Sequence, residues 1–295
     1  MKITPVTLTC SGWNDYQLLD SGDGCKLEQF GPYRLARFEP QAIWKPALST
    51  AAWKEAQARF TITKGSQTGD WHVDNDLPRE WPIGVHDMNI ELRISQSRHV
   101  GIFPEQFLNW EWLESAIHAS KSQPRLLNLF GYTGVASLLA ARAGALVTHV
   151  DSSRTALNWA RKNQELSGMT HLPIRWIAED ALKFVRREAR RGAQYQAILM
   201  DPPRFGRGPS GEVWKFEKSV SELIQTCIEI LAPNALLFCL TAYDIPNTPA
   251  EISQWLAATL KLRGGLLEYG WLQQLEKSAG RKIRQALFTR WSLYN

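Results

Sequence analysis

Residues 125–134 have the sequence Arg-Leu-Leu-Asn-Leu-Phe-Gly-Tyr-Thr-Gly, and residues 135–143 continue it with Val-Ala-Ser-Leu-Leu-Ala-Ala-Arg-Ala. The apolar run at 125–130 predicts a short strand, and the run rich in alanine and leucine at 135–143 predicts a helix. Gly131 and Gly134 lie between them, where glycine permits positive φ angles and close approach to the backbone. The stretch therefore predicts one β–α unit, whose connecting turn is the first place to look for a bound ligand.

The same alternation continues towards the C-terminus. Further strands are predicted at 146–150, 174–178, 197–200 and 235–240, and further helices at 153–166, 181–191, 220–231 and 251–262. Residues 266–272 and 286–291 are typical of a closing antiparallel pair. Alternating strands and helices imply an α/β fold with a parallel sheet covered on both faces. Such sheets bind ligands beyond the carboxyl ends of their strands.

The first hundred residues have a different pattern. Short β-prone stretches are separated by turn sequences such as Ser-Gly-Asp-Gly at 21–24 and Trp-Pro-Ile-Gly at 81–84. Polar and apolar residues alternate at 89–94, which predicts a half-buried strand. We therefore expect a small β-rich N-terminal domain or extension at 1–100, and a second domain at 101–295.

Composition restricts the class of protein only broadly. The chain has 295 residues, 44% of them hydrophobic, and a net charge of +5. That charge is compatible with RNA as a partner, but enzymes with small substrates are often equally basic. No apolar run approaches the roughly 20 residues of a membrane span, and the N-terminus lacks the apolar core of a signal peptide. The four cysteines are scattered and lack a nearby histidine set, so we expect no metal site, no disulfide framework and a cytoplasmic location.

The glycine turn favours one kind of cofactor over another. Its spacing is not Gly-x-Gly-x-x-Gly, and the bulky Phe130 and Tyr132 crowd the place where a dinucleotide pyrophosphate would lie. S-adenosylmethionine (SAM) carries an amino-acid tail and a sulfonium instead of phosphates, so it needs neither that space nor those N–H donors. The alternative is an ordinary turn without a ligand.

Two aspartates follow the next two predicted strands. Asp151 comes about 20 residues after the glycine turn, where a carboxylate can accept both ribose hydroxyls of a nucleoside cofactor. Its alternative role is helix capping, although Ser152 or Ser153 can cap that helix and leave the carboxylate for the ligand. Asp180 could contact an adenine amino group beside the Ala181 N–H, or it could simply cap the following helix.

Together these strand ends resemble the successive motifs of class I SAM-dependent methyltransferases, from residue 124 to the C-terminus. The resemblance implies a Rossmann-like, seven-stranded, mostly parallel sheet with antiparallel closing strands. It also implies a set of cofactor-binding residues, namely Asn128, Phe130, Gly131, Tyr132, Thr133, Gly134, Asp151, Ser152, Ser153, Asp180, Ala181 and Asp201.

Asp201, Pro202 and Pro203 end the strand predicted beside the first one. The two prolines remove two N–H donors, so this rigid edge offers acceptors that suit a planar substrate with an amino or imino group. Phe205 could stack on a flipped base. These four residues are the predicted catalytic set. The alternative is a plain turn that terminates the strand.

The order Asp-Pro-Pro-x-Phe, in which Arg204 separates the aromatic residue from the prolines, suggests a narrower kinship. It resembles the bacterial 23S ribosomal RNA large-subunit methyltransferases that make 5-methylcytosine or 7-methylguanine. Residues 101–106, Gly-Ile-Phe-Pro-Glu-Gln, are similar to the Gly-x-Phe-x-Asp-Gln segment of that family. The similarity implies that Phe103 and Gln106 help enclose SAM, while core packing is the alternative for Phe103.

The chain departs from that family at the fifth strand. Methylation of cytosine carbon 5 requires a thiolate nucleophile, which a cysteine supplies in that family. Ala242 aligns with this cysteine, and Cys239 falls inside the strand. We therefore expect direct SN2 transfer to RNA, with substrate contacts at Arg204, Arg207, Lys215 and Tyr243. The glycine-rich loop at 205–216 would be a mobile lid. The alternatives are a small-molecule or protein methyltransferase, or a SAM-fold binding protein without turnover.

Overall fold

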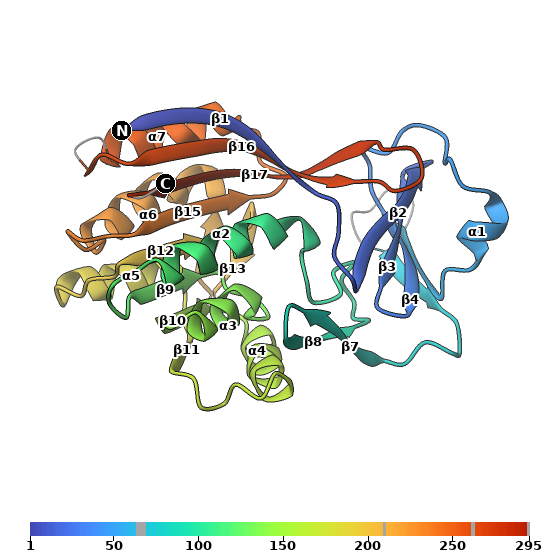
Figure 1. Cartoon of the computed structure of the whole chain (residues 1–295), viewed down its shortest axis with the longest axis horizontal. Helices are drawn as coiled ribbons and strands as arrows, with labels where there is room; N and C mark the ends of the chain where they lie inside the picture. The colour runs from blue at the N-terminus through green and yellow to red at the C-terminus, as the bar shows by residue number, and fades with distance from the viewer. Residues whose placement is uncertain (63–68, 209–210, 261–262, 294–295) are drawn as a thin grey trace. The chain divides into compact units, whose positions relative to one another are not determined.

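The computed structural model describes residues 1–62, 69–208, 211–260 and 263–293. These residues form two compact units (Figure 1). The larger unit consists of Met1–Leu8, Leu108–Leu272 and Ala286–Asn295. The smaller unit consists of Thr9–Phe107 and Gln273–Gln285. None of the described helices has the length and apolarity that a membrane crossing requires.

Eight strands within the described residues form the main sheet. In spatial order they are β1 (Lys2–Cys10), β16 (Leu266–Leu275), β17 (Lys282–Ser292), β15 (Leu237–Ala242), β12 (Ala197–Met200), β9 (Arg125–Leu129), β10 (Leu146–Asp151) and β11 (Ile174–Ala178). Strands β15, β12, β9, β10 and β11 run parallel, and β17 pairs with β15 in the antiparallel sense. The predicted α/β class and mostly parallel sheet are confirmed.

Strand β1 was not predicted as part of this sheet. It lies beside β16, where the Lys2 N–H donates to the Gly265 carbonyl at 2.9 Å. At Gly270 the two strands come so close that an added Cβ would stand 1.7 Å from the Val6 carbonyl oxygen. An exposed sheet edge offers unpaired backbone groups, and β1 covers them. The local sequence of an N-terminal strand does not specify which sheet edge the strand will join.

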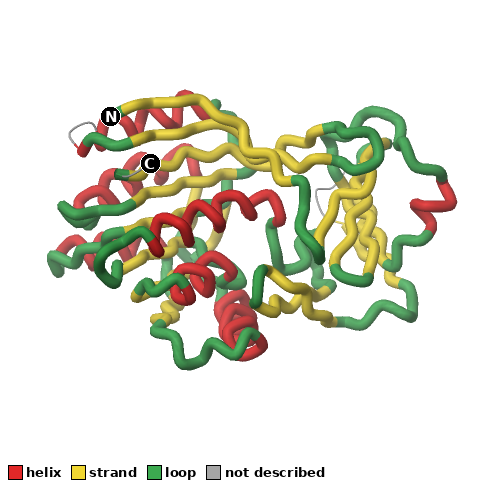
Figure 2. The backbone as a smooth tube through the Cα atoms, in the orientation of Figure 1, coloured by secondary structure: helices red, strands yellow, loops and turns green. Residues whose placement is uncertain are grey.

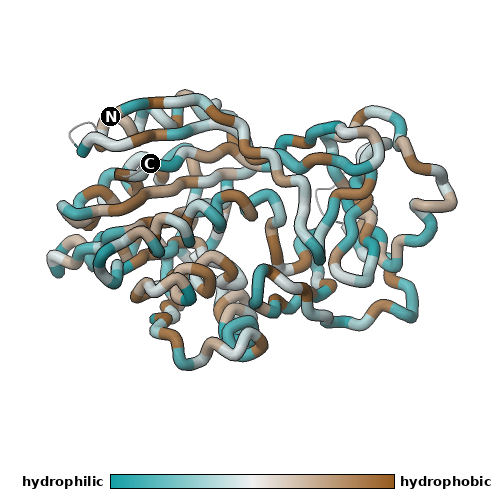
Figure 3. Tube along the Cα trace, in the orientation of Figure 1, coloured by the Kyte–Doolittle hydropathy of each residue, from teal (hydrophilic) through white to brown (hydrophobic). Residues whose placement is uncertain are grey.

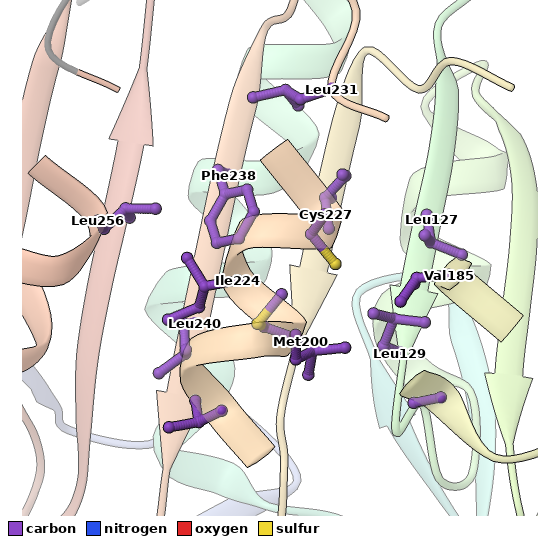
Figure 4. Close-up of a cluster of buried hydrophobic side chains, with 14 of the residues drawn as sticks. Leu127, Leu129, Val185, Met200, Ile224, Cys227, Leu231, Phe238, Leu240 and Leu256 are labelled. Carbon is purple, nitrogen blue, oxygen red and sulfur yellow. The ribbon is translucent and has the colours of Figure 1, made fainter. Parts of the chain in front are cut away.

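Helices cover both faces of the main sheet (Figure 2). They are α2 (Phe107–His118), α3 (Val135–Arg142), α4 (Arg154–Leu166), α5 (Ala181–Arg190), α6 (Phe216–Glu229) and α7 (Pro249–Leu260). Leu127 and Leu129 belong to one buried apolar cluster with residues of α5, α6 and α7, part of which Figure 4 shows. The preceding Leu126 belongs to a second cluster, with residues of α2 and α3. Apolar side chains of these strands thus reach both faces of the sheet, and hydrophobic residues recur along the central strands in Figure 3.

Several predicted helix ends shift. Helix α6 begins at Phe216, earlier than the predicted 220–231, and α7 begins at Pro249. The last two residues of the predicted helix at 251–262 lie outside the described residues. Helix ends are weakly specified by local sequence, because the first and last turns depend on packing and capping groups.

The smaller unit is rich in strands, as predicted for the N-terminal region. Its described strands form one sheet in the order β2 (Tyr16–Gly22), β3 (Cys25–Phe30), β4 (Tyr33–Phe38), β5 (Ala58–Ile62) and β6 (Gly69–Val73), and a separate hairpin of β7 (Glu80–Val85) and β8 (Met88–Arg93). It also contains the short helices α1 (Thr50–Lys54) and η1 (Pro104–Gln106).

The two compact units differ from a division at residue 100 in three segments. The first eight residues cluster with the larger unit, and residues 101–107 and 273–285 cluster with the smaller one. Residues 273–285 lie at the tip of the β16–β17 ribbon, whose strands are longer than predicted. In this tip Gln274 is buried and donates to the Tyr16 hydroxyl at 2.7 Å.

Candidate cofactor and acceptor site

The turn after β9 is held in an unusual backbone conformation. Phe130 and Tyr132 have φ angles of 57° and 51°, and Gly134, which begins α3 as its N-cap, has a φ of 85°. Left-handed φ angles in non-glycine residues are uncommon and persist only where surrounding groups hold them. The Gly131 N–H donates to the Val150 carbonyl at 3.2 Å, so the end of β10 supports this turn.

Asp151 ends β10 beside the turn, and two backbone groups orient its carboxylate. Oδ2 accepts from the Tyr132 N–H at 2.9 Å, and Oδ1 accepts from the Ser153 N–H at 2.8 Å. Burial raises the pKa of Asp151, and these two hydrogen bonds oppose the rise. The cap of α4 is Ser153, whose Oγ accepts from the Ala156 N–H at 3.2 Å. Because each carboxylate oxygen has a further lone pair, Asp151 can still accept the two hydroxyls of a ribose.

Asp180 takes the capping role that was its alternative. It is the N-cap of α5, and its Oδ1 accepts from the Lys183 N–H at 2.9 Å. Ala181, the next residue, is buried at the start of this helix. The cap uses one carboxylate oxygen of Asp180 and is therefore compatible with a ligand contact at the other. The predicted contact with adenine stays a prediction.

Two other predicted cofactor residues, Asn128 and Thr133, form hydrogen bonds with other residues of the protein. Asn128 is buried, and its Nδ2 donates to the Ser137 hydroxyl at 2.9 Å. The Thr133 carbonyl accepts from Asn163 Nδ2 at 2.9 Å. These hydrogen bonds connect the strand end and the turn to helices α3 and α4. Any direct contact of Asn128 or Thr133 with the cofactor stays a prediction.

The Asp-Pro-Pro segment lies directly beside the turn. The Asp201 N–H donates to the Leu129 carbonyl at 3.2 Å, which continues the parallel pairing of β12 and β9. Pro202 is buried and Pro203 is exposed. The strand ends of β9, β10 and β12 therefore bring the predicted cofactor turn, Asp151 and Asp201 to one edge of the sheet.

The loop predicted as a mobile lid contains a short hairpin, and its mobility stays a prediction. Strands β13 (Phe205–Arg207) and β14 (Val213–Lys215) pair in the antiparallel sense, while residues 209–210 lie outside the described residues. Phe205 lies opposite Lys215, and Arg207 lies opposite Val213. Because side chains alternate along a strand, these four residues share one face, which we call the acceptor face.

The two faces of the hairpin differ sharply in exposure. On the acceptor face, Phe205 is 54% exposed and Val213 is 56% exposed. On the opposite face, Trp214 is buried, and its Nε1 donates to the Pro203 carbonyl at 2.6 Å. Trp214 was not among the predicted site residues. A single tryptophan within a loop of glycines and charged residues was the signal that a buried anchor was present.

Two of the predicted substrate contacts, Arg204 and Tyr243, also contact other parts of the protein. Arg204 pairs with Glu217 at 3.2 Å and donates to the Asp244 carbonyl at 3.3 Å, although its side chain is 58% exposed. Tyr243 is half-buried and packs against the cluster around Phe288. Arg207 and Lys215 are exposed. The predicted roles of all four in substrate binding stay predictions.

Phe103 and Gln106 belong to the smaller unit. Phe103 precedes η1, and its ring lies 4.9 Å from the ring of His99. Gln106 is buried at the end of the same short helix. Their predicted part in enclosing SAM stays a prediction.

A model of the S-adenosylmethionine-dependent methyltransferase family matches residues 41–249. The chain belongs to this family. A solved SAM-dependent methyltransferase from Agrobacterium tumefaciens is 44% identical, with a TM-score of 0.95 over 99% of this chain and 95% of that one. These matches confirm the predicted fold, the class of enzyme and SAM as the cofactor of this methyltransferase.

The curated relatives are more distant. Ribosomal RNA large subunit methyltransferase I of Klebsiella pneumoniae is 25% identical over 92% of this methyltransferase and 70% of that protein. Ribosomal RNA large subunit methyltransferase K/L of Shewanella frigidimarina is 36% identical over 38% of this chain. This match spans only 16% of the length of the Shewanella protein.

Proposed function

We propose that this methyltransferase transfers the methyl group of SAM to RNA, with ribosomal RNA as the expected acceptor. The observation that carries the proposal is the acceptor face, where an exposed phenyl ring stands with Arg207 and Lys215 on a hairpin that directly follows Asp201 and the two prolines. The names of the curated relatives support an RNA acceptor. Such an acceptor also agrees with the expected cytoplasmic location.

The chemistry of the acceptor face suits a nucleotide. An exposed aromatic ring stacks on any base, and stacking contributes about 1–3 kcal/mol per base. Cations beside such a ring attract the phosphate backbone. Phe205 and Lys215 are cross-strand partners, so a base on the ring would place its neighbouring phosphate within reach of the ammonium group.

We assign the cofactor to the edge where β9, β10 and β12 end. Asp151 would accept the ribose hydroxyls, residues 130–134 would surround the methionine part, and Asp180 with Ala181 would contact the adenine. Bound SAM supplies an electrophilic methyl group on its sulfonium. Asp201 and the carbonyl groups of the Pro-Pro segment would orient the acceptor nitrogen towards that methyl group, because alignment supplies most of the rate enhancement in a direct displacement.

The proposed transfer is direct, without a covalent cysteine intermediate. Cys239 is buried inside β15, and burial raises the pKa of its thiol to about 12. The nearby Asp201 carboxylate also raises this pKa, while Arg290 lowers it. A thiol with that pKa is almost entirely protonated at neutral pH and is a poor nucleophile. Ala242, at the end of the same strand, carries no reactive group.

Radiolabelled methyl transfer tests the acceptor. Total RNA, protein and small-molecule fractions from a strain lacking the gene are incubated with purified enzyme and labelled SAM, and we expect label in ribosomal RNA. Phe205→Ala should lower this incorporation about tenfold, since about 1.4 kcal/mol of stacking is lost, whereas Phe205→Trp should retain it. Label confined to the protein or small-molecule fraction contradicts the proposal.

Salt dependence tests the two cations separately. For a single-stranded RNA, the slope of log K against log salt concentration is negative, and removing one phosphate contact reduces its magnitude by about 0.7. Arg207→Ala and Lys215→Ala should each produce this change in a binding titration. Arg186→Ala is the matched control, because this exposed arginine pairs with Glu222 and should leave the slope as in wild type. Equal slopes in all variants would refute the assigned phosphate contacts.

A further inference from the structure

His149 lies beneath the cofactor turn, fully buried in β10. Its ring lies against the backbone of Gly131, where an added Cβ would stand 2.4 Å from Cε1 and 2.5 Å from Nδ1. Real Cβ atoms do not come that close to another group, so any side chain at position 131 would have to displace the imidazole. The glycine is therefore required by the contact with His149.

A chain of hydrogen bonds fixes the orientation of this ring. Ser137 Oγ lies 2.9 Å from His149 Nδ1, and Asn128 Nδ2 donates to the same Oγ at 2.9 Å. Oγ accepts from Asn128 and can either donate its own proton to Nδ1 or accept a second proton from it, so this hydrogen bond is available to both tautomers of the neutral ring. Burial lowers the pKa of His149 to about 3, so the ring is neutral at physiological pH.

The last three residues of β10 act on the turn together. The His149 ring abuts Gly131, the Val150 carbonyl accepts the Gly131 N–H, and Asp151 Oδ2 accepts the Tyr132 N–H. The turn they support contains two residues with left-handed φ angles, Phe130 and Tyr132. Such angles are uncommon in non-glycine residues and persist only where the surrounding contacts hold them.

We propose that His149, Ser137 and Asn128 form a turn clamp, in which His149 is a positioning residue for SAM binding. The clamp holds the backbone of residues 131–132 in the conformation that receives the cofactor. It touches neither the methyl group nor the acceptor, so its removal should change the affinity for SAM and not the identity of the acceptor.

A double-mutant cycle tests the contact between the ring and the glycine. SAM dissociation constants are measured by calorimetry for wild type, Gly131→Ala, His149→Ala and the double variant. Each single change should weaken SAM binding about tenfold, the size expected for about 1.4 kcal/mol. The double variant should bind no more weakly than His149→Ala, because the new methyl group occupies the vacated space. Additive losses, about a hundredfold together, would overturn the proposal.

The hydrogen bond has its own test. Ser137→Ala should weaken SAM binding about three- to tenfold, since it leaves the buried Asn128 amide and the imidazole without their shared partner. Ser253→Ala is the matched control, because this buried helical serine donates to the Ala250 carbonyl in α7. It should lower the thermal midpoint and leave SAM affinity unchanged. Wild-type affinity in folded Ser137→Ala would overturn the clamp, and neither readout depends on the acceptor being RNA.

Discussion

The indole ring of Trp214 packs against the phenyl ring of Phe130, with centroids 5.1 Å apart and planes inclined at 59°. The same indole donates its Nε1–H to the Pro203 carbonyl. Trp214 therefore contacts both the predicted cofactor turn and the Asp-Pro-Pro segment. Because Trp214 lies on the buried face of the hairpin, it also positions the acceptor face relative to that segment.

Trp214→Phe tests this anchoring. The variant keeps an aromatic ring against Phe130 but leaves the Pro203 carbonyl without its donor, which costs about 1 kcal/mol. We expect kcat/KM for the RNA acceptor to fall about fivefold, while the dissociation constant for SAM changes little. Trp255→Phe is the control, since this tryptophan lies partly exposed on α7. A change confined to SAM affinity would contradict the anchoring role.

The two aspartates at the sheet edge should behave differently. We expect Asp151→Ala to weaken SAM binding by about tenfold or more, because it removes the acceptor for the ribose and for two backbone N–H groups. Asp201→Ala should mainly lower turnover. Calorimetry with SAM and initial rates with the labelled acceptor separate the two effects, and the reverse pattern would refute the assigned roles.

The pH dependence of SAM binding follows from the burial of Asp151. Burial raises the pKa of this carboxyl above that of an ordinary aspartate, despite its two hydrogen bonds. In the proposed role of Asp151 the ionised form accepts the ribose hydroxyls, so we expect affinity to be complete above the raised pKa and to be lost as the pH falls through it. Calorimetry across acidic pH should therefore show SAM affinity falling at a higher pH than titration of an exposed aspartate would give.

Cys239→Ala tests the direct mechanism. We expect the variant to keep at least about half of the wild-type rate, because a buried thiol with a pKa of about 12 contributes no nucleophile. Cys227→Ala, a second buried cysteine in α6, controls for the general cost of a small cavity. Complete loss of methyl transfer in folded Cys239→Ala, with activity kept in Cys227→Ala, would establish a covalent route instead.

A buried ion pair in the smaller unit gives a stability prediction. Glu28 accepts from Arg37 Nε at 2.6 Å and from the Tyr16 hydroxyl at 2.8 Å. Burial alone would raise the pKa of Glu28, but Arg37, Lys26 and these hydrogen bonds outweigh it and lower the pKa from 4.5 to about 2. The stability contributed by this depressed pKa is complete above pH 4.5 and is lost as the pH falls towards 2.

Glu28→Gln should lower the free energy of unfolding at pH 7 by about 3 kcal/mol, because it leaves a buried guanidinium without its counter-ion. The difference from wild type should shrink on acidification, as measured by urea unfolding at several pH values. Asp23→Asn is the control, since its pair with Lys45 is exposed and should contribute less than about 1 kcal/mol. A difference that is independent of pH would contradict the titration of Glu28.

Much of the larger unit could be predicted because its signals are local. Apolar runs such as residues 126–129 identify strands, and the aspartates at the ends of the strands at 146–150 and 197–200 predict the edge where the site lies. The cap at Ser153 also follows from neighbouring residues. For Asp180, local sequence could not choose between a cap and a ligand, because both roles require the same carboxylate at the same strand end.

The sequence by itself determined the alternation of strands and helices from residue 125 onward and the cofactor class, and it predicts the edge where the site lies. Each depends on side-chain periodicity or on residues adjacent in the chain. Only the tertiary structure decided that Trp214 joins Phe130 to Pro203, that His149 requires a glycine at 131, and that β1 closes the sheet edge. Those contacts join residues far apart in the sequence, and their geometry arises from the packing and register of whole elements, which no local pattern encodes.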